Sequence, residues 1–197
     1  MLPKKRFFFD LDGTITKEEV SPLIARKLGF ERELALLTDL TMQGTIPLKD
    51  SFRLRVQLLR SVPIPTIRKI VLNMKLNKKI VDFIQKNKDI CAIITNSLDV
   101  WVGPLCEKIG CKYYASKALM KNNKLIGIKE IIDKADLIPK NIFSVAIGDG
   151  MNDAKMLKKA TIGIAYGGVH NVSKKVLKCA DILICEERLL CQFLNQL

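Results

Sequence analysis

The sequence predicts an α/β protein in which a parallel β-sheet is covered by helices on both faces. Short, continuous apolar runs, the pattern of strands buried on both faces, occur at residues 7–9, 90–95 and 142–147. Helical patterns separate these runs, and such alternation is typical of a parallel sheet. Residues 17–73 contain helical patterns only, so we expect a small helical cap inserted after the first strand.

Two parts are therefore expected, an α/β core of residues 1–16 and 74–197 and a helical cap of residues 17–73. Apolar residues recur at helical spacing in four cap segments, at residues 17–28, 31–42, 48–59 and 66–72. Pro22 weakens the first turn of the first helix, and Gly29 is placed to end it. No strand is expected in the cap.

The core alternates helices with strands after the cap. Its helices are expected at residues 78–86, 100–109, 129–136, 152–159 and 172–179. Beyond the strands already named, we expect a strand-and-turn segment at 112–126 around Asn122-Asn123, a strand at 161–165, and a last strand and helix within 181–194. Ligands of parallel sheets bind at the carboxyl ends of the strands. Three strands end there at Asp10, Thr95 and Asp149.

Composition excludes several classes of protein. The 197 residues carry a net charge of +13, from 33 Lys and Arg against 20 Asp and Glu, and this excess is spread along the chain. We interpret it as a solvated surface and expect no nucleic-acid partner. No apolar run approaches the length of a membrane span, so a cytoplasmic protein is expected, with its oligomeric state open. The only histidine, His170, is interpreted as a surface or capping residue.

Two acidic motifs are the candidates for chemistry. Asp10 and Asp12 follow the first strand two residues apart, so their side chains leave an extended chain on the same side and repel one another unless a cation is present. Asp149 and Asp153 lie in Gly148-Asp149-Gly150-Met151-Asn152-Asp153, which follows another strand and opens a helix. Either motif alone is also compatible with an acidic turn or helix start.

The phrase Phe9-Asp10-Leu11-Asp12-Gly13-Thr14 resembles the first signature of the haloacid dehalogenase superfamily, and the second acidic motif resembles its last one. The resemblance implies a Rossmann-like core and an Mg²⁺-dependent phosphatase. Asp10 is then the nucleophile and Asp12 the acid and base. Mg²⁺ is held by Asp10, Asp149 and the backbone carbonyl of Asp12, with Asp153 and Asn152 in support.

Two further groups follow from the same resemblance. Thr95 matches the residue that hydrogen-bonds the phosphoryl group, although a hydroxyl there also suits a helix cap. Lys129 is the chosen cation that balances the phosphate and the nucleophile, and Lys124 and Lys134 stay open as alternatives.

Within the superfamily, the cap and the segment Ser51–Leu59 resemble the phosphoserine phosphatase family. The resemblance implies that Glu19 binds the amino group and Arg55 the carboxylate of O-phospho-L-serine, and that the enzyme serves serine biosynthesis. Thr95, Asn96 and Asn152 complete the expected substrate site. The chain has Thr95-Asn96-Ser97 where that family has Ser-Gly-Gly. Another small phosphomonoester, and a non-catalytic phosphate- or nucleic-acid-binding module, therefore remain alternatives.

Overall fold

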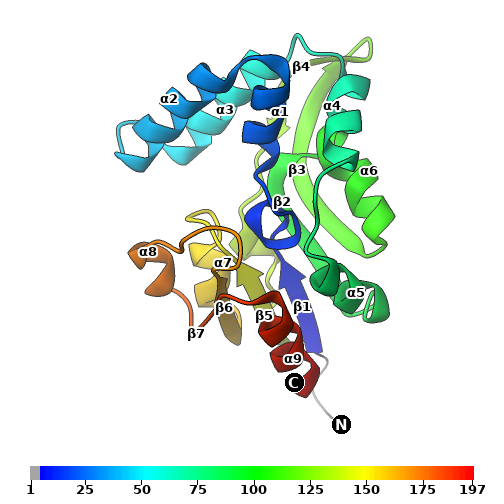
Figure 1. The fold of residues 1–197 in the computed structure, drawn as a ribbon, viewed down its shortest axis with the longest axis vertical. Coiled ribbons are helices and arrows are strands. Elements are labelled where there is room, and N and C mark those ends of the chain that lie inside the picture. The colour runs from blue at the N-terminus through cyan, green and yellow to red at the C-terminus, as the bar shows by residue number, and fades with distance from the viewer. Residues whose placement is uncertain (1–4) are drawn as a thin grey trace.

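The computed structural model describes residues 5–197 and contains a seven-stranded sheet (Figure 1). The strand order is β4-β3-β2-β1-β5-β6-β7. The strands are β1 (Lys5–Phe9), β2 (Cys91–Leu98), β3 (Lys112–Lys121), β4 (Lys124–Glu130), β5 (Phe143–Gly148), β6 (Ile162–Tyr166) and β7 (Ile182–Ile184). All neighbours are parallel except β3 and β4, which pair antiparallel. The predicted α/β fold with a mostly parallel sheet is confirmed.

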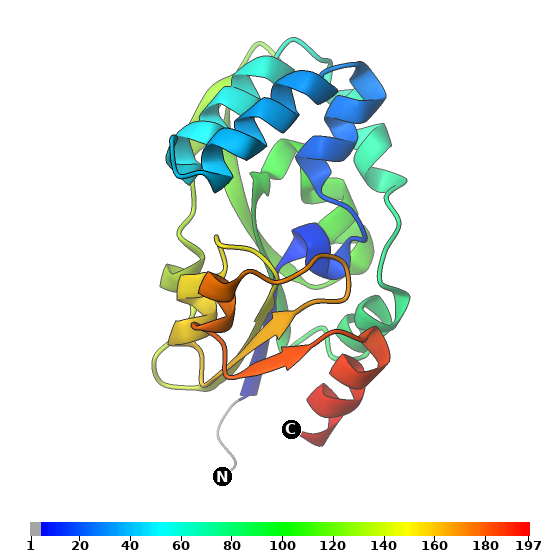
Figure 2. The same cartoon turned by 60° about the vertical axis from the view of Figure 1, so that its left-hand side comes forward.

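Four helices between β1 and the rest of the sheet form the helical insert, which lies above the carboxyl ends of the strands (Figures 1 and 2). They are α1 (Val20–Leu28), α2 (Glu31–Met42), α3 (Leu48–Leu59) and α4 (Ile64–Leu72). The remaining helices are α5 (Lys78–Lys86), α6 (Asp99–Ile109), α7 (Ala154–Lys159), α8 (Lys174–Leu177) and α9 (Glu187–Gln196). No helix within residues 5–197 has the length and apolar character needed to cross a membrane.

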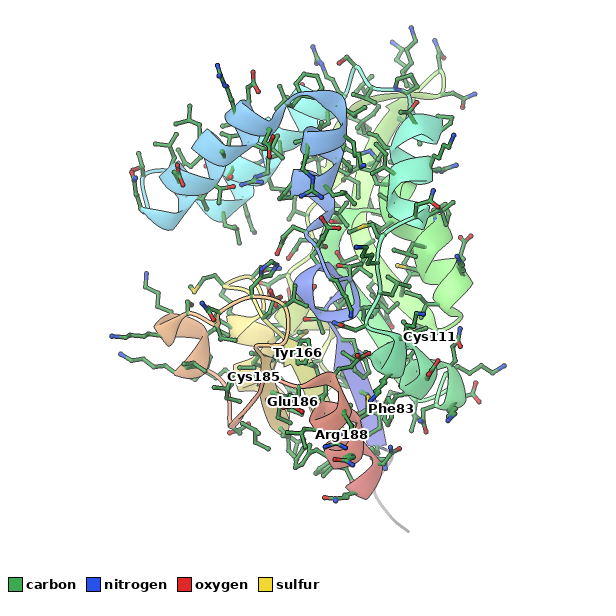
Figure 3. The ribbon with its side chains drawn as sticks, viewed as in Figure 1. Phe83, Cys111, Tyr166, Cys185, Glu186 and Arg188 are labelled. Carbon is green, nitrogen blue, oxygen red and sulfur yellow. The ribbon has the colours of Figure 1, made fainter. Side chains whose placement is uncertain are left out.

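Alternation along β1 divides the core into two layers. Phe7 and Phe9 face one layer, where the Phe83 ring on α5 lies 5.3 Å from Phe7 and 6.1 Å from Phe9 between centroids (Figure 3). Phe8 faces the other layer, which includes Met156 of α7. Successive strand residues point to opposite faces, so three consecutive phenylalanines require helices on both sides of the sheet.

The helical insert is tied to the rest of the molecule by packing and by two linking segments. Helix α4 packs on α6, where Arg68 Nε donates to the Val100 carbonyl at 2.8 Å. Helix α3 packs against β4. The two links, one before α1 and one after α4, run side by side, and Lys17 N donates to the Lys75 carbonyl at 2.8 Å between them. The insert is thus anchored at several points rather than by its links alone.

Several predicted elements differ from the structure. Strand β2 runs to Leu98 rather than ending at Thr95, and α8 covers only Lys174–Leu177 of the helix predicted at 172–179. The first helix of the insert begins at Val20 rather than at residue 17, so Pro22 lies in its first turn. The N–H groups of a first turn have no partner within the helix, so the N–H that proline lacks costs no hydrogen bond there. The predicted helix at 129–136 is wrong over its first part, because β4 continues to Glu130. Asn122 and Asn123, with φ of 48° and 60°, form the tight turn that folds β4 back onto β3. Only a single 3₁₀ turn, η2 (Lys134–Leu137), follows.

Candidate active site

The carboxyl ends of β1, β2 and β5 bring the predicted polar residues to one edge of the sheet. Strand β1 ends at Phe9, and Asp10 follows it directly and leads into the tight turn η1 (Leu11–Ile15). Gly13 in this turn has φ of +72°, and a Cβ there would lie 2.4 Å from Asp149 Oδ2. The first acidic motif can therefore approach the second only because residue 13 has no side chain.

Three carboxylates form the centre of the site. One oxygen from each of Asp10, Asp149 and Asp153 lies within 4.8 Å of the others, and all three residues are buried. Burial, followed by the charge of Asp153, raises the pKa of Asp10 well above its usual range and that of Asp149 to about 7. Such a cluster is stable in its charged form only beside cations.

Lys134 supplies one of these cations. Its side chain is 1% exposed, and its Nζ forms ion pairs with Asp10 and, at 2.6 Å, with Asp153. Burial alone would lower the pKa of Lys134, but the two carboxylates outweigh it and raise that pKa, so the ammonium group stays charged.

The sequence favoured Lys129 for this position, and the structure places it elsewhere. Lys129 is an exposed residue of β4, and it takes part in none of the ion pairs formed within residues 5–197. The reason is the length of β4, which carries Lys129 along the edge of the sheet before the chain turns back towards the site in η2. Lys134, kept as an alternative, is the lysine that contacts Asp10. Lys124 begins β4 and is exposed as well.

Asp12 makes a different set of contacts. Its Oδ2 accepts hydrogen bonds from Thr95 Oγ1 at 3.1 Å and from Ser97 Oγ at 3.0 Å. Its Oδ1 accepts one from the backbone N–H of Val20 at 2.7 Å. Because Val20 is the first residue of α1, the Asp12 carboxylate connects the end of the sheet with the start of the helical insert.

The second acidic motif is held by its own backbone. Asp153 Oδ2 accepts from the N–H of Gly150 at 2.9 Å and of Asp149 at 3.2 Å. Asn152 Nδ2 donates to Asn96 Oδ1 at 3.2 Å, and Asn96 Nδ2 donates to the Ile132 carbonyl at 2.9 Å. The Asn96 side chain is therefore held between the loop after β5 and the segment before η2.

Glu19, just before the first helix of the insert, lies at this edge beside Asp149 and His170, whereas the Arg55 side chain contacts the insert itself. Glu19 precedes α1, with its Oε1 3.8 Å from His170 Nε2, and the two side chains are 46% and 44% exposed. Partial burial, followed by the charges of Asp12 and Asp149, raises the pKa of Glu19. Arg55 on α3 is bonded to Thr38 Oγ1 at 2.8 Å, and the charge of Glu19 partly offsets the lowering of the Arg55 pKa by burial. The charge of Glu19 therefore favours the charged form of Arg55.

A divalent cation fits the carboxylate cluster. The donors are oxygen atoms only, they are buried, and Lys134 supplies one positive charge against three carboxylates. Mg²⁺ prefers such hard oxygen ligands. Asp10, Asp149 and Asp153 are therefore the residues able to hold the ion.

Comparison with known proteins decides the family. A model for haloacid dehalogenase-like hydrolases matches residues 7–158, more than half of the chain. The chain belongs to this family. Phosphoserine phosphatase of Methanocaldococcus jannaschii is 33% identical over 199 residues, covering 92% of either chain. Phosphoserine phosphatase of Archaeoglobus fulgidus is 28% identical over an alignment 206 positions long, which covers 94% of this chain but only 58% of that relative.

Solved structures agree with the assignment of this chain to the haloacid dehalogenase-like hydrolases. A phospho-aspartyl intermediate analogue of phosphoserine phosphatase superposes with a TM-score of 0.79 at 27% identity, covering 98% of this chain and 99% of that one. A substrate-bound phosphoserine phosphatase complex superposes with a TM-score of 0.81 at 26% identity and the same coverage. The protein is a phosphomonoester hydrolase similar to phosphoserine phosphatases.

Three residues of the hydrolase's site were not found by reasoning from the sequence. Ser97 was noted only as a departure from a family pattern, yet it bonds Asp12. Val20 contributes a backbone N–H, which no side-chain pattern reports. His170 was interpreted as a surface residue, and it is exposed, but its ring lies beside Gly13 and Glu19. His170 is the only histidine in the chain and follows Gly167-Gly168 closely. That was the one feature of the sequence that could have indicated a place at the site.

Proposed function

We propose that this hydrolase is an Mg²⁺-dependent phosphatase that converts O-phospho-L-serine to L-serine and inorganic phosphate. The observation that carries the proposal is the buried cluster of Asp10, Asp149, Asp153 and Lys134, with Glu19 beside Asp149 and a helical insert that carries Arg55. The similarity to phosphoserine phosphatases across more than nine-tenths of the chain supports the substrate.

Asp10 is the nucleophile in this proposal. One of its carboxylate oxygens forms a bond to phosphorus while the bond from phosphorus to the serine oxygen breaks, which leaves an aspartyl phosphate. Lys134 helps to keep Asp10 ionised, since burial alone would favour the protonated acid. Mg²⁺, held by Asp10, Asp149 and Asp153 together with the backbone carbonyl of Asp12, would offset the negative charge of the phosphate and the carboxylates.

Asp12 is the acid and the base. In the first step its carboxyl proton passes to the departing serine oxygen, and in the second its carboxylate takes a proton from the water that attacks the aspartyl phosphate. The second step releases inorganic phosphate and restores Asp10. Thr95 and Ser97 orient one oxygen of Asp12, and Val20 orients the other. When the substrate is bound, the single hydroxyl proton of Thr95 would turn from Asp12 to the phosphoryl group, and Ser97 would keep its bond to Asp12.

The helical insert would act as a cap, and its residues would select the substrate. The Glu19 carboxylate suits an ammonium group, and the Arg55 guanidinium suits a carboxylate in two-point geometry. Asn152 and Asn96 lie on the core side of the same space and bond each other.

One observation favours a second candidate, a phosphatase for a different small phosphomonoester. Asn96 stands where the phosphoserine phosphatase family has glycine, and its side chain is held by Ile132 and Asn152 at the site. A side chain at this position reduces the room beside the phosphoryl group and adds an amide dipole. Another phosphoamino compound or a sugar phosphate could match that surface better.

Phosphate release from a panel of phosphomonoesters tests the proposal. The panel includes L-phosphoserine, phosphoethanolamine, which lacks the carboxylate, phosphoglycolate, which lacks the amine, and a sugar phosphate. We expect L-phosphoserine to have the highest kcat/KM, with no release in chelator or by Asp10→Asn. A higher kcat/KM for another ester would assign the second candidate, and no release from any ester would refute hydrolysis of these substrates.

A further inference from the structure

A second hollow lies on the molecule outside the carboxylate site. It has a volume of about 510 Å³ and is lined by α1, α4 and the two links that join the helical insert to the sheet. We call it the hinge groove and define it by Glu18, Arg26, Lys27, Lys69 and Lys75. None of the three clustered carboxylates lines it, and its volume is within the range of small-molecule sites, about 300 to 1,000 Å³.

The hinge groove has an excess of positive charge. Four of its charged residues are cationic and one, Glu18, is acidic. Glu18 is already paired with Arg26. Lys27, Lys69 and Lys75 are exposed and form no ion pair among the residues that the structure describes. These three exposed ammonium groups line one hollow, so a bound anion would meet positive charge that no carboxylate of the groove neutralises.

The floor of the hinge groove is apolar. Leu23 and Met74 are each 7% exposed, and Ile70 is half-buried. Little of Leu23 and Met74 reaches water, so the exposed part of Ile70 is the main apolar surface that an inorganic ion would leave uncovered. An organic anion would cover it while its charged groups meet the lysines at the rim.

We propose that the hinge groove binds a small organic anion that carries at least two negative charges, and that binding strengthens the existing packing of α1 on α4. Helix α4 is held to α6 through Arg68, so it belongs to the anchored part of the molecule. Helix α1 begins with the N–H that holds Asp12, directly after Glu19. An anion that joins Lys27 of α1 to Lys69 of α4 would therefore restrain the start of α1 and change turnover. This effect on turnover rests on the proposed function, whereas the binding does not.

Binding is tested by thermal unfolding in buffer freed of metal over a chelating resin, at constant ionic strength. Without metal, the three clustered carboxylates repel anions, so a rise in Tm reports another site. The probes are citrate, which carries carboxylate groups, and ADP, which carries phosphate groups and a flat aromatic base. The probe with the larger shift identifies the anion class. The test variant is Lys69→Gln/Lys75→Gln. The matched control is Lys174→Gln/Lys175→Gln, which removes the same charge from exposed positions of α8.

We expect a saturable rise in Tm with at least one probe. Its apparent affinity should fall about tenfold in the test variant and stay within about twofold in the control. No shift with either probe, or an equal loss of affinity in both double variants, would overturn the site.

Turnover is measured separately with L-phosphoserine at fixed free Mg²⁺. The probe that binds should change kcat by about twofold or more in the wild-type protein and the control but not in the test variant. A probe that binds without changing kcat overturns the coupling and leaves the site standing. A chain that binds the probe but hydrolyses none of the esters refutes the proposed function alone.

Discussion

Replacing Lys134 by methionine is the sharpest test of how this site is held together. The substitution keeps much of the side-chain volume and removes the charge that faces Asp10 and Asp153, which are 1% and 0% exposed. Two buried carboxylates would then lack their protein cation. Breaking a buried ion pair by removing one partner costs about 3 to 5 kcal/mol. That is a large part of the stability of a typical domain, about 5 to 15 kcal/mol.

The cost should depend on pH, and the sign follows from the pKa of Asp10. Burial already raises this pKa above its unfolded value, and Lys134 opposes that rise. In Lys134→Met the pKa of Asp10 rises further, so the folded variant binds a proton that the unfolded chain has released. Stability is then lost as pH rises between the unfolded and the folded pKa. One extra bound proton changes the free energy of unfolding by about 2.7 kcal/mol over two pH units.

The assay is urea unfolding in metal-free buffer at pH 6 and pH 8, with Lys129→Met as the matched control on exposed β4. We expect Lys134→Met to lose several kcal/mol at pH 8 and markedly less at pH 6, and Lys129→Met to stay within about 0.5 kcal/mol of wild type at both. Phosphatase activity should fall at least about a hundredfold in Lys134→Met only. Equal losses at the two pH values, or equal losses in the two variants, would refute the reasoning.

Three further predictions concern the metal, the substrate and the turn. Mg²⁺ should raise Tm at pH 8 and bind more weakly as pH falls through about 7. Burial and the charge of Asp153 raise the pKa of Asp149 to about 7, so protons compete with the ion below that pH. Titration calorimetry at pH 6 and pH 8 measures the affinity, and equal affinity at both would contradict this prediction. Glu19→Gln should raise KM for L-phosphoserine about tenfold and leave KM for phosphoglycolate, which has no amine, unchanged. Steady-state kinetics measures both constants, with Glu31→Gln as the control, and parallel changes for the two esters would show that Glu19 does not bind the amine. Gly13→Ala should destabilise the fold by about 1 kcal/mol more than Gly44→Ala in urea unfolding, because both have positive φ but only Gly13 also meets Asp149; equal losses would show that the contact with Asp149 does not matter.

The fold class could be predicted from the sequence because it depends on local patterns. The apolar runs ending at Asp10 and Thr95 and before Asp149 are strands, and the segment after β1 is helical, as the periodicity indicated. The error at residues 129–136 has a tertiary cause. Pairing with β3 keeps the chain extended to Glu130, and a short segment's own preference is weaker than a row of hydrogen bonds to a neighbouring strand.

The candidate site divides in the same way. The sequence by itself determined that the two acidic motifs meet at one edge of the sheet. Each motif follows a strand, and the carboxyl ends of parallel strands lie at the same edge. Only the tertiary structure decided which lysine meets them. Lys134 is 124 residues from Asp10, and neighbouring residues do not report whether a lysine is solvated or buried beside two carboxylates. The bonds from Ser97 and Val20 to Asp12 were likewise decided by the tertiary structure, because such contacts depend on where the chain returns in space.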